Sequence, residues 1–340
     1  MPTNVKFAPR RLGHLNLFVS DVERSAAFYR DVCGFKEVFR EPEISMIFMT
    51  NGNTHHDLGL MEITPEDRVG RDGHVQVRPG AGKTPGLNHL GFEMQTEAAL
   101  VDAYRRALKQ KVPVSRTTDH QIAHSVYLSE CNGHFFEFYA DIIEDFSAFY
   151  AENQGALISG HWDPEQTAPS EDARFPKDPD LFKSNDAVLT SRNVAYAGLP
   201  VKDLQASIDY YADVLGLNAV QVDHESKFAV LEGSAQGGCD VCLMETTEFP
   251  ATRLLFGGVN LHDGKALTDA LKVLESKRIP ASFIGDTELS CIVVLDPDRI
   301  PLVYSTSPAG RLMARHGPAV VAEIRRLWAS NADEANAATL

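Results

Sequence analysis

The chain has 340 residues, enough for two domains that each bury a hydrophobic core. Its formal net charge of −15 argues against nucleic acid or an anionic membrane as a partner, and no apolar run approaches the roughly 20 residues of a membrane-spanning helix. The odd number of cysteines, five, and an N-terminus without an apolar signal-peptide core favour a reducing compartment, so we expect a cytoplasmic protein.

The first predicted strand spans residues 12–19, where apolar and polar positions alternate. It ends at Ser20-Asp21, a pair typical of a helix N-cap. His14 lies within this strand and Asn16 follows two positions later. Because strand side chains alternate between faces, these two polar side chains share one face.

Two later segments carry comparable residues. His89 lies in a predicted strand at 86–93 that leads into a helix over 97–111, and Glu137 lies within a turn and strand at 132–139. Two neutral imidazoles and one carboxylate form the facial triad that holds Fe(II) or a similar first-row metal and leaves positions open for substrate. We therefore predict that His14, His89 and Glu137 bind a metal. Their placement on repeated strands strengthens an otherwise weak signal.

The second half of the chain repeats the first. Residues 15–35 match 197–217 without a gap, and residues 57–62 match 240–245, which indicates a duplication. Each half also divides into two strand-helix-strands modules. Four modules predict two domains, at residues 1–150 and 191–310.

The repeat provides a test of the metal site, because ligands are expected to vanish from a copy that holds no metal while packing residues persist. The alignment places a non-ligand opposite each predicted ligand: Tyr196 for His14, Gly258 for His89 and Val303 for Glu137. This pattern favours a metal site over the alternative, in which the three residues are two satisfied core histidines and a paired acid.

The remaining segments connect or extend these modules. Residues 151–190 predict a linker over the surface, since 153–185 are rich in Pro, Asp, Gly and Ser. Residues 311–340 predict a C-terminal amphipathic helix, with leucine, valine and isoleucine at helical spacing over 311–329, and a tail. The helix either docks on its own domain or contributes to a subunit contact, and we expect a homo-oligomer.

Cys239 and Cys242 form a nominal CxxC motif in a predicted strand. Positions three apart on a strand point to opposite faces. We therefore interpret both cysteines as packing residues.

On these motifs the chain resembles the vicinal oxygen chelate superfamily, which includes glyoxalases, bleomycin resistance proteins and extradiol dioxygenases. The resemblance implies an α+β fold in which four βαβββ modules pair into two cupped mixed sheets flanked by helices. The first half is similar to the type I extradiol ring-cleavage dioxygenases. The residues that resemble the active site of these dioxygenases lie within residues 11–141.

The resemblance also implies roles for residues beyond the ligands. Asn16 is similar to an active-site asparagine, and the stretch from His55 to Leu60 resembles the strand that bears an acid-base histidine, which we assign to His56. Tyr127 lies ten positions before Glu137, the spacing of the family's active-site tyrosine, and His120 resembles another pocket histidine.

The reaction implied is cleavage of the aromatic ring of a catechol-type substrate by O2 with Fe(II). Mn(II) accepts the same ligands. His56 would serve as acid and base, Tyr127 would donate a hydrogen bond to a substrate oxygen, and Asn16 would orient oxygen or substrate. Common two-domain relatives keep their metal in the C-terminal domain, whereas here the complete triad is in the N-terminal one.

The sequence is compatible with alternatives. His55 competes with His56 for the acid-base role, and Tyr127 is also compatible with a packed strand aromatic. A glyoxalase or fosfomycin-resistance type lyase, isomerase or thiol transferase would use Glu62 as a fourth ligand, but the copy without ligands retains this residue as Glu245. A third class is a non-catalytic binder of the bleomycin-sequestering type.

Overall fold

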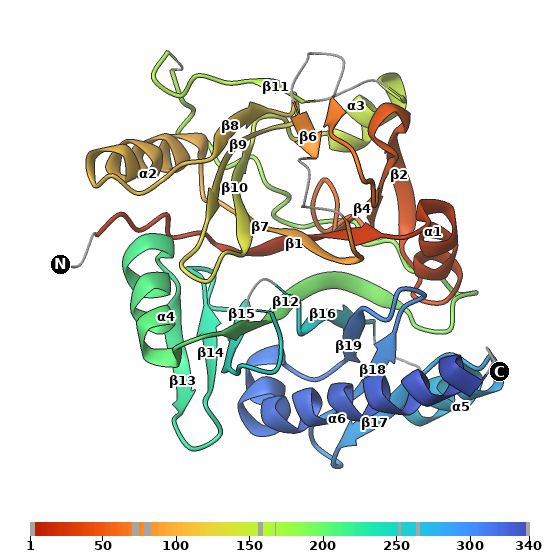
Figure 1. The fold of residues 1–340 in the computed structure, drawn as a ribbon. Helices are drawn as coiled ribbons and strands as arrows, with labels where there is room; N and C mark the ends of the chain where they lie inside the picture. The colour runs from red at the N-terminus through yellow and green to blue at the C-terminus, as the bar shows by residue number, and fades with distance from the viewer. Residues whose placement is uncertain are drawn as a thin grey trace.

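The computed structural model describes residues 4–69, 75–77, 83–155, 159–166, 168–250, 253–262 and 266–337. Two large mixed β-sheets, one from each half of the chain, pack against each other with helices around them (Figure 1). Among the described residues, no helix has the length and apolar character needed to cross a bilayer.

The first sheet has the strand order β11-β8-β9-β10-β7-β1-β4-β3-β2. Its strands are β1 (Arg11–Val19), β2 (Lys36–Glu41), β3 (Met46–Thr50), β4 (Leu58–Glu62), β7 (Gly86–Glu93), β8 (Arg116–Asp119), β9 (Ala123–Ser129), β10 (Phe135–Asp141) and β11 (Gly160–His161). The helices of this half are α1 (Val22–Asp31), α2 (Glu97–Lys109), α3 (Phe146–Glu152) and the short 3₁₀ turn η1 (Pro42–Ile44). A small separate ribbon pairs β5 (Arg68–Val69) with β6 (Val75–Val77).

The second sheet has the order β13-β14-β15-β12-β16-β19-β18-β17. Its strands are β12 (Ser191–Val201), β13 (Asn218–Asp223), β14 (Phe228–Glu232), β15 (Val241–Glu245), β16 (Phe256–Leu261), β17 (Ala281–Gly285), β18 (Ser290–Leu295) and β19 (Pro301–Ser305). Its helices are α4 (Leu204–Tyr210), the π-helical turn η2 (Tyr211–Leu215), α5 (Leu267–Ser276) and α6 (Ala309–Ala337).

Both sheets have the same pattern of strand pairing. In the first, β1 pairs in parallel with β4 and antiparallel with β7, while β7 pairs in parallel with β10. In the second, β12, β15, β16 and β19 repeat these pairings. The four predicted strand-helix-strands modules are therefore present, two in each sheet.

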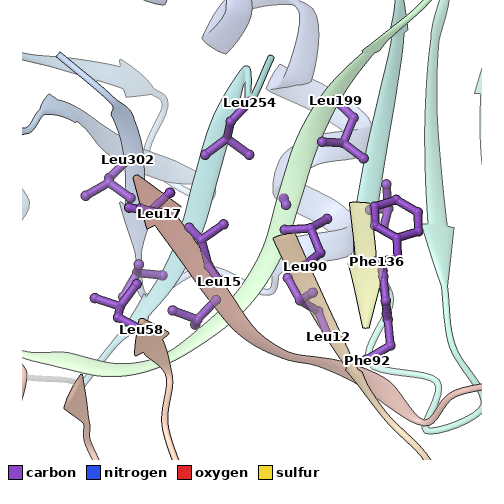
Figure 2. Packing of buried hydrophobic residues seen from close by; sticks show 14 of the residues in the cluster. Leu12, Leu15, Leu17, Leu58, Leu90, Phe92, Phe136, Leu199, Leu254 and Leu302 are labelled. Atoms are coloured by element: carbon purple, nitrogen blue, oxygen red, sulfur yellow. The ribbon is translucent and has the colours of Figure 1, made fainter. Parts of the chain in front are cut away.

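The two sheets share one hydrophobic core. Figure 2 shows Leu15 and Leu17 of β1 among leucines of both halves, including Leu254 and Leu302. The approach is close: a Cβ atom on Gly257 of β16 would lie 2.6 Å from a methyl group of Leu15. Because strand side chains alternate, His14 and Asn16 face the opposite way, into the concave side of the first sheet.

Helix α6 covers part of the second sheet. Its buried side chains, which include Leu312, Met313 and Ile324, form a cluster with Tyr196 and Val303. The predicted C-terminal helix therefore docks on its own half of the chain.

The strand register corrects one predicted equivalence. The matching pairs are His14 with Gly91 and Tyr196 with Gly258, then Asn16 with His89 and Gly198 with Phe256. The residue equivalent to His89 is therefore Phe256, and the alignment to Gly258 was wrong by two positions. The segment between β4 and β7 is longer than that between β15 and β16, so the alignment had no fixed register here.

The prediction for the CxxC pair was also wrong in its geometry. Cys239 lies before β15, not within it, and the alternation of strand faces does not apply to it. Its Sγ lies 3.5 Å from that of Cys242. Both thiols are buried in the cluster beneath α6, so they do pack in a core.

Candidate metal centre and active site

The three predicted metal ligands converge at the centre of the first sheet. They project from neighbouring strands, with His14 of β1 and Glu137 of β10 both paired with Gly91 of β7. The Nε2 atoms of His14 and His89 lie 3.0 Å and 2.9 Å from Oε2 of Glu137. All three side chains are buried.

Gly91 makes this convergence sterically possible. A Cβ atom on this glycine would lie 1.9 Å from Nε2 of His14. The imidazole of His14 therefore occupies the space of an absent side chain. Sequence reasoning missed Gly91, whose role is set by its position between two ligand strands.

These donors fit a divalent ion. Two ligands at right angles with bonds of about 2.1 Å have donor atoms about 3.0 Å apart, close to the separations found here. The Oδ1 atom of Asn88 lies 3.0 Å from Nδ1 of His89 and the Nδ2 atom of Asn16 lies 3.0 Å from its Nε2. An amide oxygen only accepts, so Nδ1 of His89 carries the proton and Nε2 presents a lone pair. That lone pair faces the carboxylate of Glu137, an arrangement that a cation would stabilise.

The protonation states suit metal binding as well. Burial lowers the pKa of His14 to about 4, so its imidazole is neutral near pH 7. Burial alone would raise the pKa of Glu137, but its close contacts with the imidazoles of His14 and His89 outweigh burial and hold this pKa well below its ordinary value. Neutral imidazoles and an ionised carboxylate are the forms that bind metals. A second group, His14 with His55 and His56, also has its ligand atoms within 4.8 Å of one another.

Asn16 links a predicted ligand to the predicted acid-base residue. Its Oδ1 lies 3.2 Å from Nε2 of His56, on the other side of the amide from His89. The ring of His56 also stacks on that of His14, and burial lowers the pKa of His56 well below its ordinary value. His55, the competing candidate, has its Nδ1 3.0 Å from Oδ1 of Asp141. Of the two histidines, His56 is the one that contacts Asn16.

Tyr127 and His120 lie beside the carboxylate of Glu137, the third predicted ligand. Tyr127 of β9 is paired directly with Glu137 of β10, and its hydroxyl lies 2.9 Å from Nε2 of His120. Burial raises the pKa of Tyr127 well above its ordinary value and lowers that of His120 to about 4. Ser125 donates a hydrogen bond of 2.5 Å to Oε1 of Glu137 and so fixes the second carboxylate oxygen.

Two further residues at the site carried no sequence signal that identified them. The guanidinium of Arg116 lies 4.3 Å from the centre of the Tyr127 ring. Ser159, from the predicted linker, has its Oγ 3.3 Å from Nδ1 of His120. The linker therefore forms part of the wall of the site rather than only connecting the two halves.

Several of these residues line one pocket in the first half of the chain. Asn16, His56, His89, His120, Tyr127 and Glu137 all contribute to its lining. The rest of the lining consists of an apolar set, Ile44, Met46, Phe48, Met61, Ile122 and Tyr150, and a polar set, Glu41, His55, Asn88, Arg116 and Ser159. The site thus combines convergent polar groups with an apolar surface able to pack a flat ring.

Glu62, the alternative fourth ligand, has another role. Its Oε2 accepts a hydrogen bond from the amide of Val22, in the first turn of α1. Glu245 does the same for the amide of Leu204 in α4. A carboxylate at a helix N-terminus is stabilised by the orphan amides and the helix dipole, which explains its presence in both halves.

A family model described as the Glyoxalase/Bleomycin resistance protein/Dioxygenase superfamily matches residues 11–138 and 193–299. One match falls in each half, in agreement with the duplication. Among solved structures, the substrate complex of homoprotocatechuate 2,3-dioxygenase from Brevibacterium fuscum is similar with a TM-score of 0.58 at 17% identity, covering 87% of this chain and 81% of that one. The 2,3-dioxygenase LapB from Pseudomonas sp. KL28 gives 0.59 at 16%, covering 87% and 92%. The predicted α+β fold of paired modules is confirmed.

Sequence similarity to curated proteins is shorter. Catechol-2,3-dioxygenase of Bacillus subtilis is 43% identical over 49 residues, 14% of this chain and 17% of that protein. Mitochondrial methylmalonyl-CoA epimerase of Homo sapiens is 30% identical over 104 residues, 29% of this chain and 55% of that protein. The chain thus covers only 17% and 55% of the length of these relatives.

Proposed function

Because the chain belongs to the Glyoxalase/Bleomycin resistance protein/Dioxygenase superfamily, we propose that it is a metal-dependent extradiol dioxygenase that opens the aromatic ring of a catechol-type substrate with O2. The observation that carries the proposal is the convergence of His14, His89 and Glu137 beside His56 and Tyr127. All of these residues except His14 line the same pocket. The likeness in fold to two 2,3-dioxygenases supports it.

In this proposal His14, His89 and Glu137 hold Fe(II), with Mn(II) accepted by the same donor types. When bound, the metal supplies Lewis acidity that eases deprotonation of the catechol, and open positions that bring both reactants together. The outer-shell groups keep the donors aligned. Asn88 fixes the tautomer of His89, and Ser125 holds the carboxylate of Glu137.

His56 is proposed to transfer protons. It is neutral near pH 7, lines the cavity and lies beside His14, within reach of a ligand bound at the triad. Asn16 fixes the edge of its ring through the contact with Nε2. A buried neutral imidazole is able to accept a proton from one oxygen and return it to another as charge develops.

Tyr127 is proposed to donate its hydroxyl proton in a hydrogen bond to a substrate oxygen. Its raised pKa keeps the phenol protonated, as a donor must be. His120 holds the phenol oxygen in place, and the apolar wall packs against the ring and excludes water.

A second candidate is an oxygen-independent isomerase or lyase of the glyoxalase type. The match to methylmalonyl-CoA epimerase favours it. Against it stands Glu62, which caps α1 and is not among the cavity residues. Such an enzyme would not consume oxygen, which separates the two candidates.

The test is oxygen consumption by protein reconstituted with Fe(II) under anaerobic conditions and then exposed to mono- and bicyclic catechols. We expect stoichiometric uptake with a coloured ring-opened product for at least one catechol. His14→Ala and Glu137→Ala are expected to abolish both metal binding and uptake. A chain that binds one metal ion tightly and consumes no oxygen with any catechol contradicts the proposal and favours the second candidate.

A further inference from the structure

A carboxylate from the half without the triad holds the strand that carries His14. Asp240 lies just before β15, and its Oδ1 accepts a hydrogen bond of 2.7 Å from the backbone amide of Leu12. Its Oδ2 accepts another of 2.7 Å from the amide of Gly233. The side chain is 3% exposed, so both bonds are shielded from water. Leu12 precedes His14 by two residues.

The duplication makes the contact reciprocal. Asp57, the equivalent of Asp240, accepts a hydrogen bond of 3.1 Å at Oδ1 from the amide of Val194 in β12. Its Oδ2 accepts from the amide of Asn51 at 3.0 Å. Each half of the molecule therefore braces the central strand of the other. The strand held by Asp57 carries Tyr196 where the strand held by Asp240 carries His14.

The hydrogen bond from Leu12 to Asp240 lies at an irregular point of the first sheet. The pairing of β1 with β7 shifts register between Leu12 and His14, as in a β-bulge. A bulge leaves one residue outside the ladder and redirects the next side chain, so strand pairing alone fixes the direction of His14 less firmly here. The intervening residue is Gly13, where a Cβ atom would lie 1.9 Å from the hydroxyl of Tyr139.

The amide of Leu12 needs this acceptor. A buried N–H without a partner costs about 1–3 kcal/mol, and a charged acceptor gives a stronger bond than a neutral one. Without the Asp240 carboxylate, the strand would have to rotate or open to satisfy this amide. Either movement would shift the imidazole two residues away.

On these grounds we propose that Asp240 is a positioning residue for the metal site, and that the half of the chain without ligands serves to hold His14 in its ligating position. The inference rests on the proposed function, because it presupposes that His14 binds a metal. Asp240 touches neither substrate nor metal and acts only through the backbone at Leu12.

The experiment compares Asp240→Asn with Asp57→Asn. Each substitution is at a buried aspartate and replaces one carboxylate oxygen, an acceptor, by an amide NH2 group, a donor. Anaerobic equilibrium dialysis gives the affinity for Fe(II), and thermal unfolding gives the stability of each variant. We expect similar losses of Tm, but a loss of about tenfold in Fe(II) affinity only for Asp240→Asn, at the low end of what outer-shell changes cause. Equal affinities for wild type and Asp240→Asn, or equal losses in both variants, would overturn the inference.

A second measurement needs no variant and covers the case in which Asp240→Asn fails to fold. Hydrogen exchange of the wild-type chain is followed at the amides of Leu12 and Val194, with and without Fe(II). If the hydrogen bond from Leu12 to Asp240 is coupled to metal binding, thermodynamic linkage requires that the bound metal stabilise this hydrogen bond. We expect Fe(II) to slow exchange at Leu12 and not at Val194.

Equal slowing at both amides, or none at Leu12 in a chain that binds Fe(II), contradicts the inference alone. A wild-type chain that binds no Fe(II) contradicts the proposed function as well. The two failures are therefore distinguishable.

Discussion

The imidazole of His56 stacks on that of His14, with ring centroids 4.1 Å apart and planes inclined by 27°. A predicted proton-transfer group therefore lies in van der Waals contact with a predicted metal ligand. The adjacent His55 lies farther from His14, with centroids 5.7 Å apart, and is tied to Asp141. This difference allows the two neighbouring histidines to be tested separately.

Replacing His56 by Asn is expected to lower kcat by a factor of about 10² to 10⁴, the usual contribution of general acid-base catalysis, while Fe(II) content is unchanged. The reason is that His56 contacts Asn16 and the cavity, not the carboxylate of Glu137. Steady-state oxygen uptake and metal analysis of the purified variant measure the two effects.

The matched control is His124→Gln. This histidine is held by Glu97 and stacks on Trp162, outside the site, so turnover should remain at the wild-type level. If His55→Asn rather than His56→Asn removed turnover, our assignment of the acid-base residue would be wrong.

Gly91→Ala is expected to abolish metal binding in a folded protein. The new methyl group would lie 1.9 Å from Nε2 of His14 and would displace the imidazole from its position beside Glu137. Overpacking of this kind costs about 1–3 kcal/mol, and the loss of stability should therefore be moderate. Fe(II) titration together with circular dichroism measures both quantities.

The second half supplies the control for this variant. Gly258→Ala would bring its methyl carbon to 2.3 Å from the ring of Tyr196, a comparable clash at the equivalent position. It should lower Tm while Fe(II) affinity stays at the wild-type value. Retention of metal by Gly91→Ala would show that His14 is not a required ligand.

Ser159→Ala is expected to lower kcat by about fivefold without loss of metal, since one net hydrogen bond contributes about 1 kcal/mol. The lost bond is the one between Ser159 Oγ and Nδ1 of His120, which in turn holds the hydroxyl of Tyr127. Oxygen-uptake kinetics at saturating catechol reports the change. Ser159→Thr retains a hydroxyl and should retain most of the activity; equal losses in both variants would indicate a packing role instead.

The convergence of the three predicted ligands could be predicted because two independent patterns coincide at these residues. The alternation of apolar and polar residues along 12–19 predicted the face of the strand on which His14 lies. In the copy, Tyr196 and Val303 fill the positions of His14 and Glu137, so packing at these positions does not require a histidine or a glutamate. The equivalent of His89 was predicted wrongly, since segments of different length precede β7 and β16 and leave the register undetermined.

Other contacts could not be predicted from the sequence because they join distant parts of the chain. Ser159 lies in a segment without periodicity, and its contact with His120 depends on how that segment folds back over β8. Asp240 and Leu12 are separated by 228 positions and meet only through the packing of the two sheets. The alternation of a strand does not encode a partner of this kind.

Stability is expected to depend on pH through Asp296, a buried carboxyl in the second half. Burial raises its pKa from the ordinary value of 3.8 to about 7. A raised pKa means that the folded chain prefers the protonated form. This contribution to stability is complete below about pH 4 and is lost as pH rises through about 7, by an amount on the order of a few kcal/mol.

Thermal unfolding of wild type and Asp296→Asn at pH 5 and pH 8 isolates this group. Other groups titrate equally in both proteins, so the wild type should lose more Tm than the variant on going from pH 5 to pH 8. The amide oxygen of Asn still accepts the backbone bonds from Asp298 and Ile300. Identical pH dependence in both proteins would show that Asp296 is ionised in the folded chain throughout this range.

The most direct test of the proposed function uses ¹⁸O₂. Fe(II)-reconstituted protein is mixed with the catechol that gives the fastest oxygen uptake, and the product is analysed by mass spectrometry beside His56→Asn and Glu137→Ala. The proposed function predicts a ring-opened product that contains both atoms of one ¹⁸O₂ molecule, formed slowly by His56→Asn and not at all by Glu137→Ala. An intact ring, or a product without ¹⁸O from a protein that binds Fe(II), would contradict it.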